Sequence, residues 1–384
     1  MIEADDFLAP ARRQGFDFYT GVPCSYLTPL INRVINDPAN RYVGAASEGE
    51  AVGIAAGAWL AGRQTVVMCQ NSGLGNAVNP LTSLNAPFQI PTLLVVTWRG
   101  QPGLPDEPQH ELMGQITPEL LDTLRIPHMA FPASMEEIGP AIAAMSASLA
   151  ETRLPFAFIM EKGSVRDDGL SQTTPPPRPS GTRADYRVSA ERPTRYAILE
   201  RLLAVVPENA AIVASTGKCG RELFTLDDRR QHLYQVGSMG CAAPMGLGVA
   251  LNTNRPVVVL DGDGAALMKL GAFATVGAMG PENLLHIILD NGVHDSTGGQ
   301  PTVSPSVDFA AIALSCGYAG AALADDPGGF EQALTAALAS PGPHLIHVRI
   351  RPGSIDGLGR PTLSPREVAD RFKAFLAEAD GKTG

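Results

Sequence analysis

The residues best suited to chemistry lie at the ends of two consecutive apolar runs in the second half of the chain. One run, Val257 to Leu260, leads into Gly262-Asp263-Gly264, and the next, Leu284 to Leu289, leads into Asn291. If both runs are parallel strands, their carboxyl ends meet at one edge of a sheet, where α/β proteins bind ligands. The oxygen atoms of Asp263 and Asn291 suit a hard cation such as Mg²⁺.

The glycines beside Asp263 favour a phosphate ligand near this cation. Gly262 and Gly264 permit a close approach of the backbone, and a helical stretch begins at Ala265. The first N–H groups of a helix lack partners within the helix and bind anions such as phosphate. A lone Gly-Asp-Gly after a strand is also common as a plain turn, so the interpretation depends on the paired Asn291.

Together these residues resemble the thiamine-diphosphate-dependent enzymes, whose hallmark is Gly-Asp-Gly followed, about one helix and one strand later, by Asn. That family usually has two consecutive Asn residues, whereas this chain has Asp290-Asn291. The resemblance implies that Asp263, Asn291 and the backbone carbonyl of Val293 ligate Mg²⁺, which in turn holds the diphosphate of the cofactor.

A stretch near the N-terminus resembles the helix of the same family that contacts the pyrimidine ring of the cofactor. It runs from Ser47 to Gly57, and its spacing places Glu48 rather than Glu50 at the catalytic glutamate. The resemblance implies that Glu48 hydrogen-bonds the pyrimidine ring and activates the cofactor. Two acidic residues in the first turn of a helix are also common without function, because the helix dipole stabilises them.

Two more stretches match cofactor-binding segments of the family. Gln70 to Asn76 resembles a glycine-rich turn and contributes Ser72 and Gly73 as cofactor-binding candidates. Gly237 to Gly240 resembles the segment whose large residue, here Met239, supports the bent cofactor, with Ser238 beside it. A methionine in a protein core is the alternative interpretation of Met239.

The chain has only a pyrimidine-type half and a diphosphate-type half, a short layout that resembles phosphonopyruvate decarboxylases and sulfopyruvate decarboxylases. The matching segments are Thr20 to Ser25, Arg99-Gly100 with Gln109-His110, Ser215 to Lys218 with Arg221 to Leu223, and His294 to Gln300. The resemblance implies decarboxylation of 3-phosphonopyruvate to phosphonoacetaldehyde and CO₂. Open alternatives are decarboxylation of sulfopyruvate, another 2-oxo acid decarboxylase or carboligase, and a phosphate-binding regulatory protein without enzymatic activity.

A 2-oxo acid that also carries a phosphonate or sulfonate requires cationic groups in its pocket, because Arg and Lys pair with such anions. The substrate-binding candidates are Ser25, Arg99, His110, Lys218, Arg221 and His294. His110 and His294 are also candidates for catalytic proton transfer, beside Glu48. With Thr216 and Gly217, Lys218 is alternatively a ligand of the cofactor diphosphate. Any one of these cations is alternatively a plain surface charge.

The elements that must position these residues follow an α/β alternation. We expect strands at Asp17–Thr20, Thr65–Cys69, Thr92–Thr97, Phe156–Met160, Ala211–Ala214, Val257–Leu260, Leu284–Leu289 and Leu345–Ile350. We expect helices at Ala51–Ala61, Met135–Leu149, Tyr196–Val206 and Glu367–Ala379. This pattern predicts two doubly wound parallel-sheet domains, one over residues 1–165 and one over residues 194–384. The Pro-rich stretch 166–193 between them is predicted to be an extended linker.

The composition limits the classes of function. A net charge of −10 disfavours a general nucleic-acid-binding protein, and no apolar run approaches the roughly 20 residues of a membrane span. The five scattered cysteines and the acidic N-terminus favour a cytoplasmic protein with reduced thiols. The family resemblance implies a homodimer or higher homo-oligomer with active sites at subunit interfaces.

Overall fold

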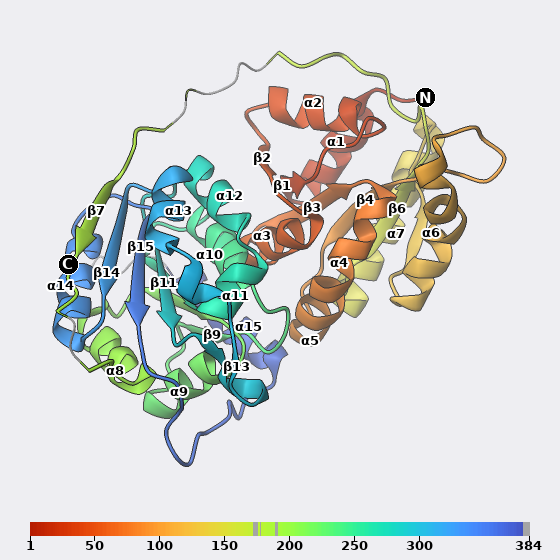
Figure 1. The fold of residues 1–384 in the computed structure, drawn as a ribbon. Helices are drawn as coiled ribbons and strands as arrows, with labels where there is room; N and C mark the ends of the chain where they lie inside the picture. Colours follow the sequence, from red (N-terminus) through yellow and green to blue (C-terminus); the bar gives the residue numbers. More distant parts are fainter. Residues whose placement is uncertain (172–175, 177, 189–190, 379–384) are drawn as a thin grey trace. The chain divides into compact units, whose positions relative to one another are not determined.

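The computed structural model describes residues 1–171, 176, 178–188 and 191–378 (Figure 1). The chain divides into two compact units. The first comprises Met1–Trp59 and Arg63–Pro175, and the second comprises Leu60–Gly62 and Pro176–Gly384.

The first unit is a parallel sheet in the order β2-β1-β3-β4-β6-β5. Its strands are β1 (Phe16–Gly21), β2 (Arg41–Gly44), β3 (Gln64–Cys69), β4 (Leu93–Thr97), β5 (His128–Ala130) and β6 (Phe156–Met160). The helices α1 (Ala4–Arg13), α2 (Thr28–Asn36) and α7 (Met135–Thr152) contribute to one core, and α3 (Glu48–Leu60), α4 (Leu74–Pro80) and α6 (Glu111–Thr123) to the other. Every residue of β4 and β6 is buried, as expected for strands covered on both faces.

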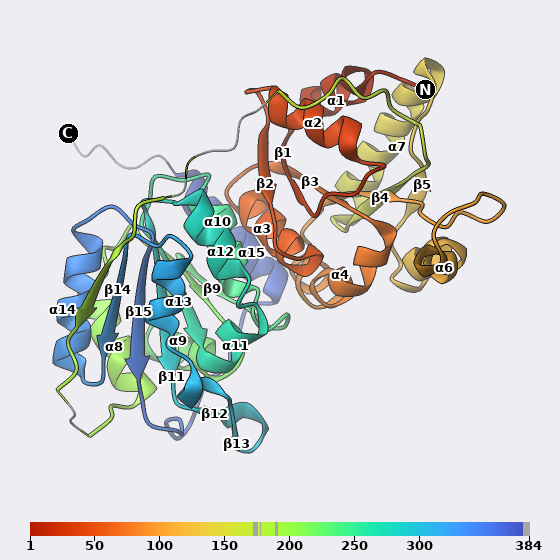
Figure 2. The same cartoon turned by 45° about the horizontal axis from the view of Figure 1, so that its top comes forward.

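The second unit is also a parallel sheet, in the order β7-β14-β15-β11-β10-β8-β9. Its strands are β7 (Thr182–Asp185), β8 (Ala211–Ala214), β9 (His232–Tyr234), β10 (Val257–Gly262), β11 (Leu284–Asp290), β14 (Gly320–Ala324) and β15 (His344–Arg349). Two groups of helices pack on it: α8 (Arg195–Val205), α9 (Lys218–Leu226) and α14 (Pro327–Leu338), and α10 (Ala242–Ala250), α12 (Ala272–Met279) and α13 (Phe309–Ser315). Figure 2 shows α13 and α14 at different faces of this sheet.

The predicted fold class is confirmed, because each unit is a parallel sheet with helices on both faces. The strands predicted at Phe156–Met160 and Ala211–Ala214 have the predicted bounds. The helix predicted at Ala51–Ala61 begins three residues earlier, at Glu48. The predicted closing helix is α15 (Pro365–Ala377), and residue 379 of that prediction lies outside the described residues.

One expectation for the Pro-rich stretch is wrong. Thr182–Asp185 is not an unpacked linker, because it forms the edge strand β7 and pairs in parallel with β14. Its side chains are mostly exposed, so it lacks the apolar signal by which buried strands are recognised. Residues 172–175, 177 and 189–190 of the predicted linker lie outside the described residues.

Candidate active site

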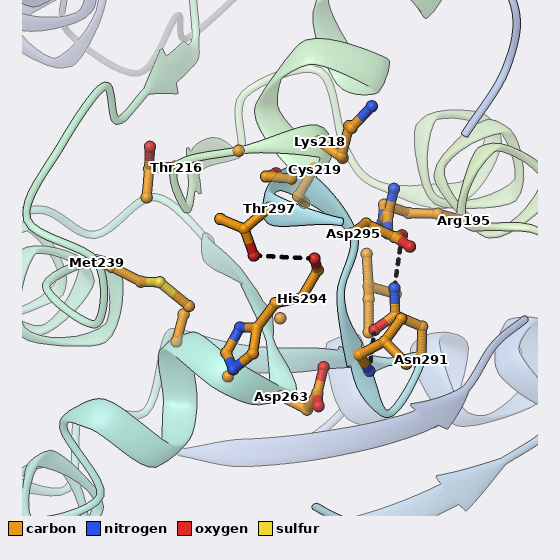
Figure 3. Close-up of a pocket in the computed structure, with 17 residues that line it drawn as sticks. Arg195, Thr216, Lys218, Cys219, Met239, Asp263, Asn291, His294, Asp295 and Thr297 are labelled. Carbon is orange, nitrogen blue, oxygen red and sulfur yellow. Dashed lines mark hydrogen bonds and ion pairs between the residues drawn. The ribbon is translucent and has the colours of Figure 1, made fainter. Parts of the chain in front are cut away.

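A pocket in the second unit lies at the carboxyl ends of β10 and β11 (Figure 3). These strands are parallel neighbours with Gly262 opposite Leu289. The backbone turns from β10 directly into the short helix α11 (Asp263–Met268), while β11 ends at Asp290. The register therefore brings Asp263 and Asn291 to the same edge of the sheet, as the sequence predicts.

The pocket gathers most of the predicted cofactor-binding and metal-binding residues of the second unit. These are Thr216, Gly217, Lys218, Met239, Gly262, Asp263, Gly264, Ala265, Asn291 and Val293. His294, which was predicted for catalysis and substrate binding, also lines the pocket. Its remaining lining residues were not predicted as site residues, although the last three belong to the matching segment His294 to Gln300: Arg195, Cys219, Leu289, Asp295, Ser296 and Thr297. The predicted residues Ser238 and Arg221 do not line this pocket.

The carboxylate of Asp263 is buried, with only 2% of the residue exposed. The Thr302 hydroxyl donates a 2.5 Å hydrogen bond to Asp263 Oδ2. Burial raises the pKa of Asp263, and the neighbouring Asp290 carboxylate raises it further. A cation at this position would offset both effects, so the electrostatics of Asp263 suit a metal ligand.

The side chain of Asn291 is held in one orientation by two hydrogen bonds (Figure 3). Its amide nitrogen donates to Asp295 Oδ2 at 2.6 Å, and its Oδ1 accepts from the backbone N–H of Val293 at 3.1 Å. Arg195 donates in turn to Asp295 Oδ2 at 2.7 Å, and its side chain is only 6% exposed. These contacts identify the amide oxygen as the atom of Asn291 that can bind a metal.

The donor set fits Mg²⁺ better than a transition metal. One carboxylate, one amide oxygen and the predicted Val293 carbonyl are hard oxygen donors of the kind Mg²⁺ takes. No group of three or more His, Cys, Asp or Glu side chains suited to a metal occurs in the described part of the chain. The residues therefore fit a cation that keeps part of its coordination sphere for water and phosphate.

His294 and Met239 flank the Gly-Asp-Gly turn (Figure 3). A β-carbon at Gly264 would lie 2.8 Å from Cε1 of His294 and 3.1 Å from Cε of Met239. This close approach explains why glycine occupies position 264. Ser238 precedes Met239 with a φ of +52°, which is uncommon for a residue with a side chain. This backbone conformation forms a sharp turn, after which Met239 lines the pocket.

Glu48 begins α3 in the first unit and faces the turn after β3. Asn76 donates a 2.8 Å hydrogen bond to Glu48 Oε2. A β-carbon at Gly73 would lie 2.4 Å from Glu48 Oε1, so only glycine leaves room for this carboxylate. Ser72 lies in the same turn and accepts a hydrogen bond from Gln70 at 2.6 Å. Of the predicted residues of this unit, Glu48, Ser72 and Gly73 thus form one cluster.

Glu50 has a different environment. It is 1% exposed, and its Oε2 accepts a hydrogen bond from the backbone N–H of Ala46 at 3.0 Å. Glu48 is half-buried and lies at the glycine-rich turn. The geometry thus gives Glu50 a structural role at the start of α3 and leaves Glu48 as the carboxylate available to a ligand.

The charge of Arg99 is already paired. Arg99 donates to Asp106 at 2.7 Å through Nε, and its hydrogen bonds hold the pKa of Asp106 well below its usual range. Arg99 also lies over the ring of Tyr26 and donates to Ser25 Oγ at 3.2 Å. Ser25 and Arg99 are therefore neighbours, but a substrate anion at Arg99 would compete with a carboxylate.

His110 lies just before α6 and is 7% exposed. Its Nδ1 is buried and has no hydrogen-bond partner within the described residues. Such a group costs free energy unless a ligand or water satisfies it. His110 is therefore a candidate for ligand contact.

Sequence comparisons identify the domain families to which the two parts of the chain belong. Residues 215–348 match the thiamine pyrophosphate enzyme C-terminal TPP-binding domain, and residues 3–124 match the N-terminal TPP-binding domain. The phosphonopyruvate decarboxylase of Streptomyces viridochromogenes is 55% identical over 98% of this chain and 95% of its own length. That of Streptomyces hygroscopicus is 51% identical over the same shares, and the sulfopyruvate decarboxylase of Methanosarcina acetivorans is 30% identical over 95% of each chain.

Solved structures show the same fold at low sequence identity. A benzoylformate decarboxylase from Polynucleobacter necessarius superposes with a TM-score of 0.70 at 13% identity, over 92% of this chain and all of that one. A thiamin diphosphate-dependent enzyme from Mycobacterium smegmatis gives the same TM-score at 15% identity and the same coverage. The two Streptomyces relatives and the two TPP-binding domain models show that the chain belongs to the phosphonopyruvate decarboxylase family of thiamine-diphosphate-dependent enzymes.

Proposed function

We propose that this chain is a carboxy-lyase that decarboxylates 3-phosphonopyruvate to phosphonoacetaldehyde and CO₂, using thiamine diphosphate and Mg²⁺. The main support is 55% identity to a phosphonopyruvate decarboxylase over nearly the whole of both chains. The juxtaposition of Asp263 and Asn291 in one pocket supports the cofactor requirement independently.

The residues of the second unit would hold the metal and the diphosphate. Asp263, Asn291 and the Val293 carbonyl would ligate Mg²⁺, with Thr302 and Asp295 fixing the two side chains. Gly262 lines the pocket, and a β-carbon there would meet nothing within 4 Å, so the space beside it is open to a ligand. Thr216, Gly217 and Ala265 line this pocket and would contact the cofactor beside the metal.

The residues of the first unit would act on the ring end of the cofactor. Bound thiamine diphosphate supplies the electron sink that accepts negative charge when CO₂ leaves the 2-oxo acid. Glu48 would hold a proton against the nearby ring nitrogen, with Asn76 restricting its orientation. Gly73 keeps the space beside Glu48 open, and Ser72 would contact the cofactor from the same turn.

His110 and His294 would serve proton transfer or substrate binding. His294 lines the metal pocket beside Gly264, so it lies close to where the cofactor diphosphate would enter. His110 has an unsatisfied buried Nδ1 in the described structure, which a substrate oxygen would satisfy. An imidazole can both accept and donate a proton, so either side chain is chemically suited to protonating the product carbon.

The assembly is proposed from the family and from the division of the site into two clusters. Glu48 lies in the first unit and Asp263 in the second. The family resemblance implies a homodimer or larger homo-oligomer, which would complete each site from two subunits. Each helix in the described part of the chain is too short or too polar to cross a membrane. No disulfide joins the five described cysteines, four of which are buried, as a reducing cytoplasm would allow.

The direct test measures CO₂ release from 3-phosphonopyruvate with added thiamine diphosphate and Mg²⁺, with and without a metal chelator. Sulfopyruvate is the appropriate competitor, because a 30% identical relative is a sulfopyruvate decarboxylase. We expect a higher kcat/KM for phosphonopyruvate and loss of activity with chelator. A higher kcat/KM for sulfopyruvate would show that sulfopyruvate, rather than phosphonopyruvate, is the preferred substrate.

A further inference from the structure

A second cavity adjoins the metal pocket in the second unit. Thr216, Gly217, Lys218 and Ser296 line both cavities, so they form a shared wall. Beyond this wall the second cavity is bordered by Arg221 and Arg360. Its described lining therefore contains three cationic side chains, including Lys218, and no Asp or Glu.

Arg360 lies in the segment 350–364 between β15 and α15, and contacts from α9 hold this segment in place. Arg221 donates from Nε to the carbonyl of Gly359 at 2.9 Å and from Nη2 to that of Leu358 at 2.7 Å. The Gly359 N–H donates to Thr225 Oγ1 at 2.9 Å. A β-carbon at Gly359 would lie 3.0 Å from this oxygen, so the segment packs closely on the helix. These contacts fix the backbone on which Arg360 stands.

The acidic residue of the same helix turns away from the cavity and holds the segment from its other end. Glu222 is 1% exposed, and its Oε1 lies 3.5 Å from Arg195 and accepts from the Ile355 N–H at 3.3 Å. Glu222 therefore borders neither cavity. The segment is tied to α9 by Glu222 and Arg221 alike, while the cavity retains an excess of positive charge.

The cations themselves are available to an anion. Arg360 is exposed and has no ion pair within the described residues. Lys218 Nζ contacts the neutral hydroxyl of Ser354 at 3.2 Å, and in Figure 3 its side chain points away from Asp263. Both residues differ in this respect from Arg99, whose guanidinium is paired with Asp106.

We propose that this cavity binds the phosphonate group of the substrate, with Arg360 and Lys218 contacting its oxygens and Arg221 positioning the Arg360 segment. The inference rests on the proposed function and adds Arg360 as a specificity residue. A phosphonate dianion gains more from several cations than a sulfonate monoanion does, because the interaction scales with charge. The shared wall sets the bound anion beside the pocket proposed for the metal and the cofactor diphosphate.

The test compares Arg360→Gln with Arg351→Gln, a matched control. Arg351 lies in the same connecting segment but pairs with Glu191 and does not line the cavity. For Arg360→Gln in the holoenzyme we expect KM for phosphonopyruvate to rise roughly 10- to 100-fold with little change in kcat, since one charge-assisted contact is lost. Arg360→Lys should recover part of this loss, and the affinity for thiamine diphosphate with Mg²⁺ should not change.

A binding measurement separates this inference from the proposed function. Titration calorimetry of the holoenzyme with methylphosphonate should show binding that weakens at least tenfold in Arg360→Gln and is unchanged in Arg351→Gln. Methanesulfonate, with one negative charge, should bind wild type more weakly than methylphosphonate. If wild type binds methylphosphonate, Arg360→Gln loses this binding, and wild type does not decarboxylate phosphonopyruvate, the anion site is supported and the proposed function is rejected. Unchanged methylphosphonate affinity and KM in Arg360→Gln would reject the anion site.

Discussion

Gly73 lies so close to Glu48 that a β-carbon at position 73 would stand 2.4 Å from the Oε1 atom of the glutamate. The two residues come from different elements, because Glu48 begins α3 and Gly73 precedes α4. The absence of a side chain at Gly73 therefore creates the space into which the Glu48 carboxylate extends. The glycine-rich turn would therefore affect catalysis by leaving this space for the Glu48 carboxylate.

Gly73→Ala is expected to displace Glu48 and lower kcat/KM by at least tenfold, because the methyl group and the carboxylate cannot share the space. Gly75→Ala is the matched control, since a β-carbon at Gly75 would meet nothing within 4 Å and alanine favours the helix. Steady-state kinetics and thermal unfolding of both variants provide the check. Equal kcat/KM values for the two variants would contradict the proposed role of the clearance.

Asp295→Asn is expected to weaken Mg²⁺-dependent binding of thiamine diphosphate roughly tenfold, the lower end of typical effects for residues behind metal ligands. The substitution removes the carboxylate that orients the Asn291 amide and leaves Arg195 without its close partner. Asp356→Asn, at an exposed position in the same half, is the control. Fluorescence titration with cofactor at several Mg²⁺ concentrations measures the change, and identical titration curves would refute this role of Asp295.

The stability of the protein should fall as the pH falls from about 6.5 toward 4 because of His232. Burial, followed by the charge of Arg229, lowers the pKa of His232 to about 4. The unfolded state, with a pKa near 6.5, therefore takes up the proton first, and stability present above pH 6.5 is lost over this window. For a shift of this size the linked free energy is on the order of 3 kcal/mol.

Urea unfolding of wild type and His232→Asn between pH 4 and pH 7.5 measures this contribution. The difference in unfolding free energy between the two proteins should change across the window and become constant above about pH 7. His232 is fully buried and lines neither of the two pockets, so the measurement concerns stability alone. Parallel pH profiles would show that His232 does not titrate as expected.

The sequence predicted the parallel sheets, and the meeting of Asp263 and Asn291 at one sheet edge, for one physical reason. Buried parallel strands are continuous apolar runs, and the polar residues at their carboxyl ends stand out against them, as at Asp263 and Asn291. The cofactor residues, including Glu48 and Val293, required the family resemblance, because an acidic helix start or a backbone carbonyl has no distinctive local pattern.

What the sequence did not reveal depends on tertiary contacts. β7 is polar and exposed at the edge of its sheet, so its strand character comes from pairing with β14 rather than from an apolar run. Arg195 reaches the metal pocket from the start of α8, about 100 residues before its partner Asp295. Arg221 was a candidate for substrate contact, yet its guanidinium binds two backbone carbonyls, which no local pattern indicates.

Glu48 and the Asp263–Asn291 pocket would together give this chain its phosphonopyruvate decarboxylase activity. Phosphorus NMR of the reaction with 3-phosphonopyruvate, thiamine diphosphate and Mg²⁺ tests it most directly, using wild type, Glu48→Gln and the exposed control Glu151→Gln. We expect a phosphonoacetaldehyde signal from wild type and Glu151→Gln. For Glu48→Gln we expect a rate at least 100-fold lower, because a proton-transfer residue is lost. No aldehyde from wild type, or equal rates for wild type and Glu48→Gln, would contradict it.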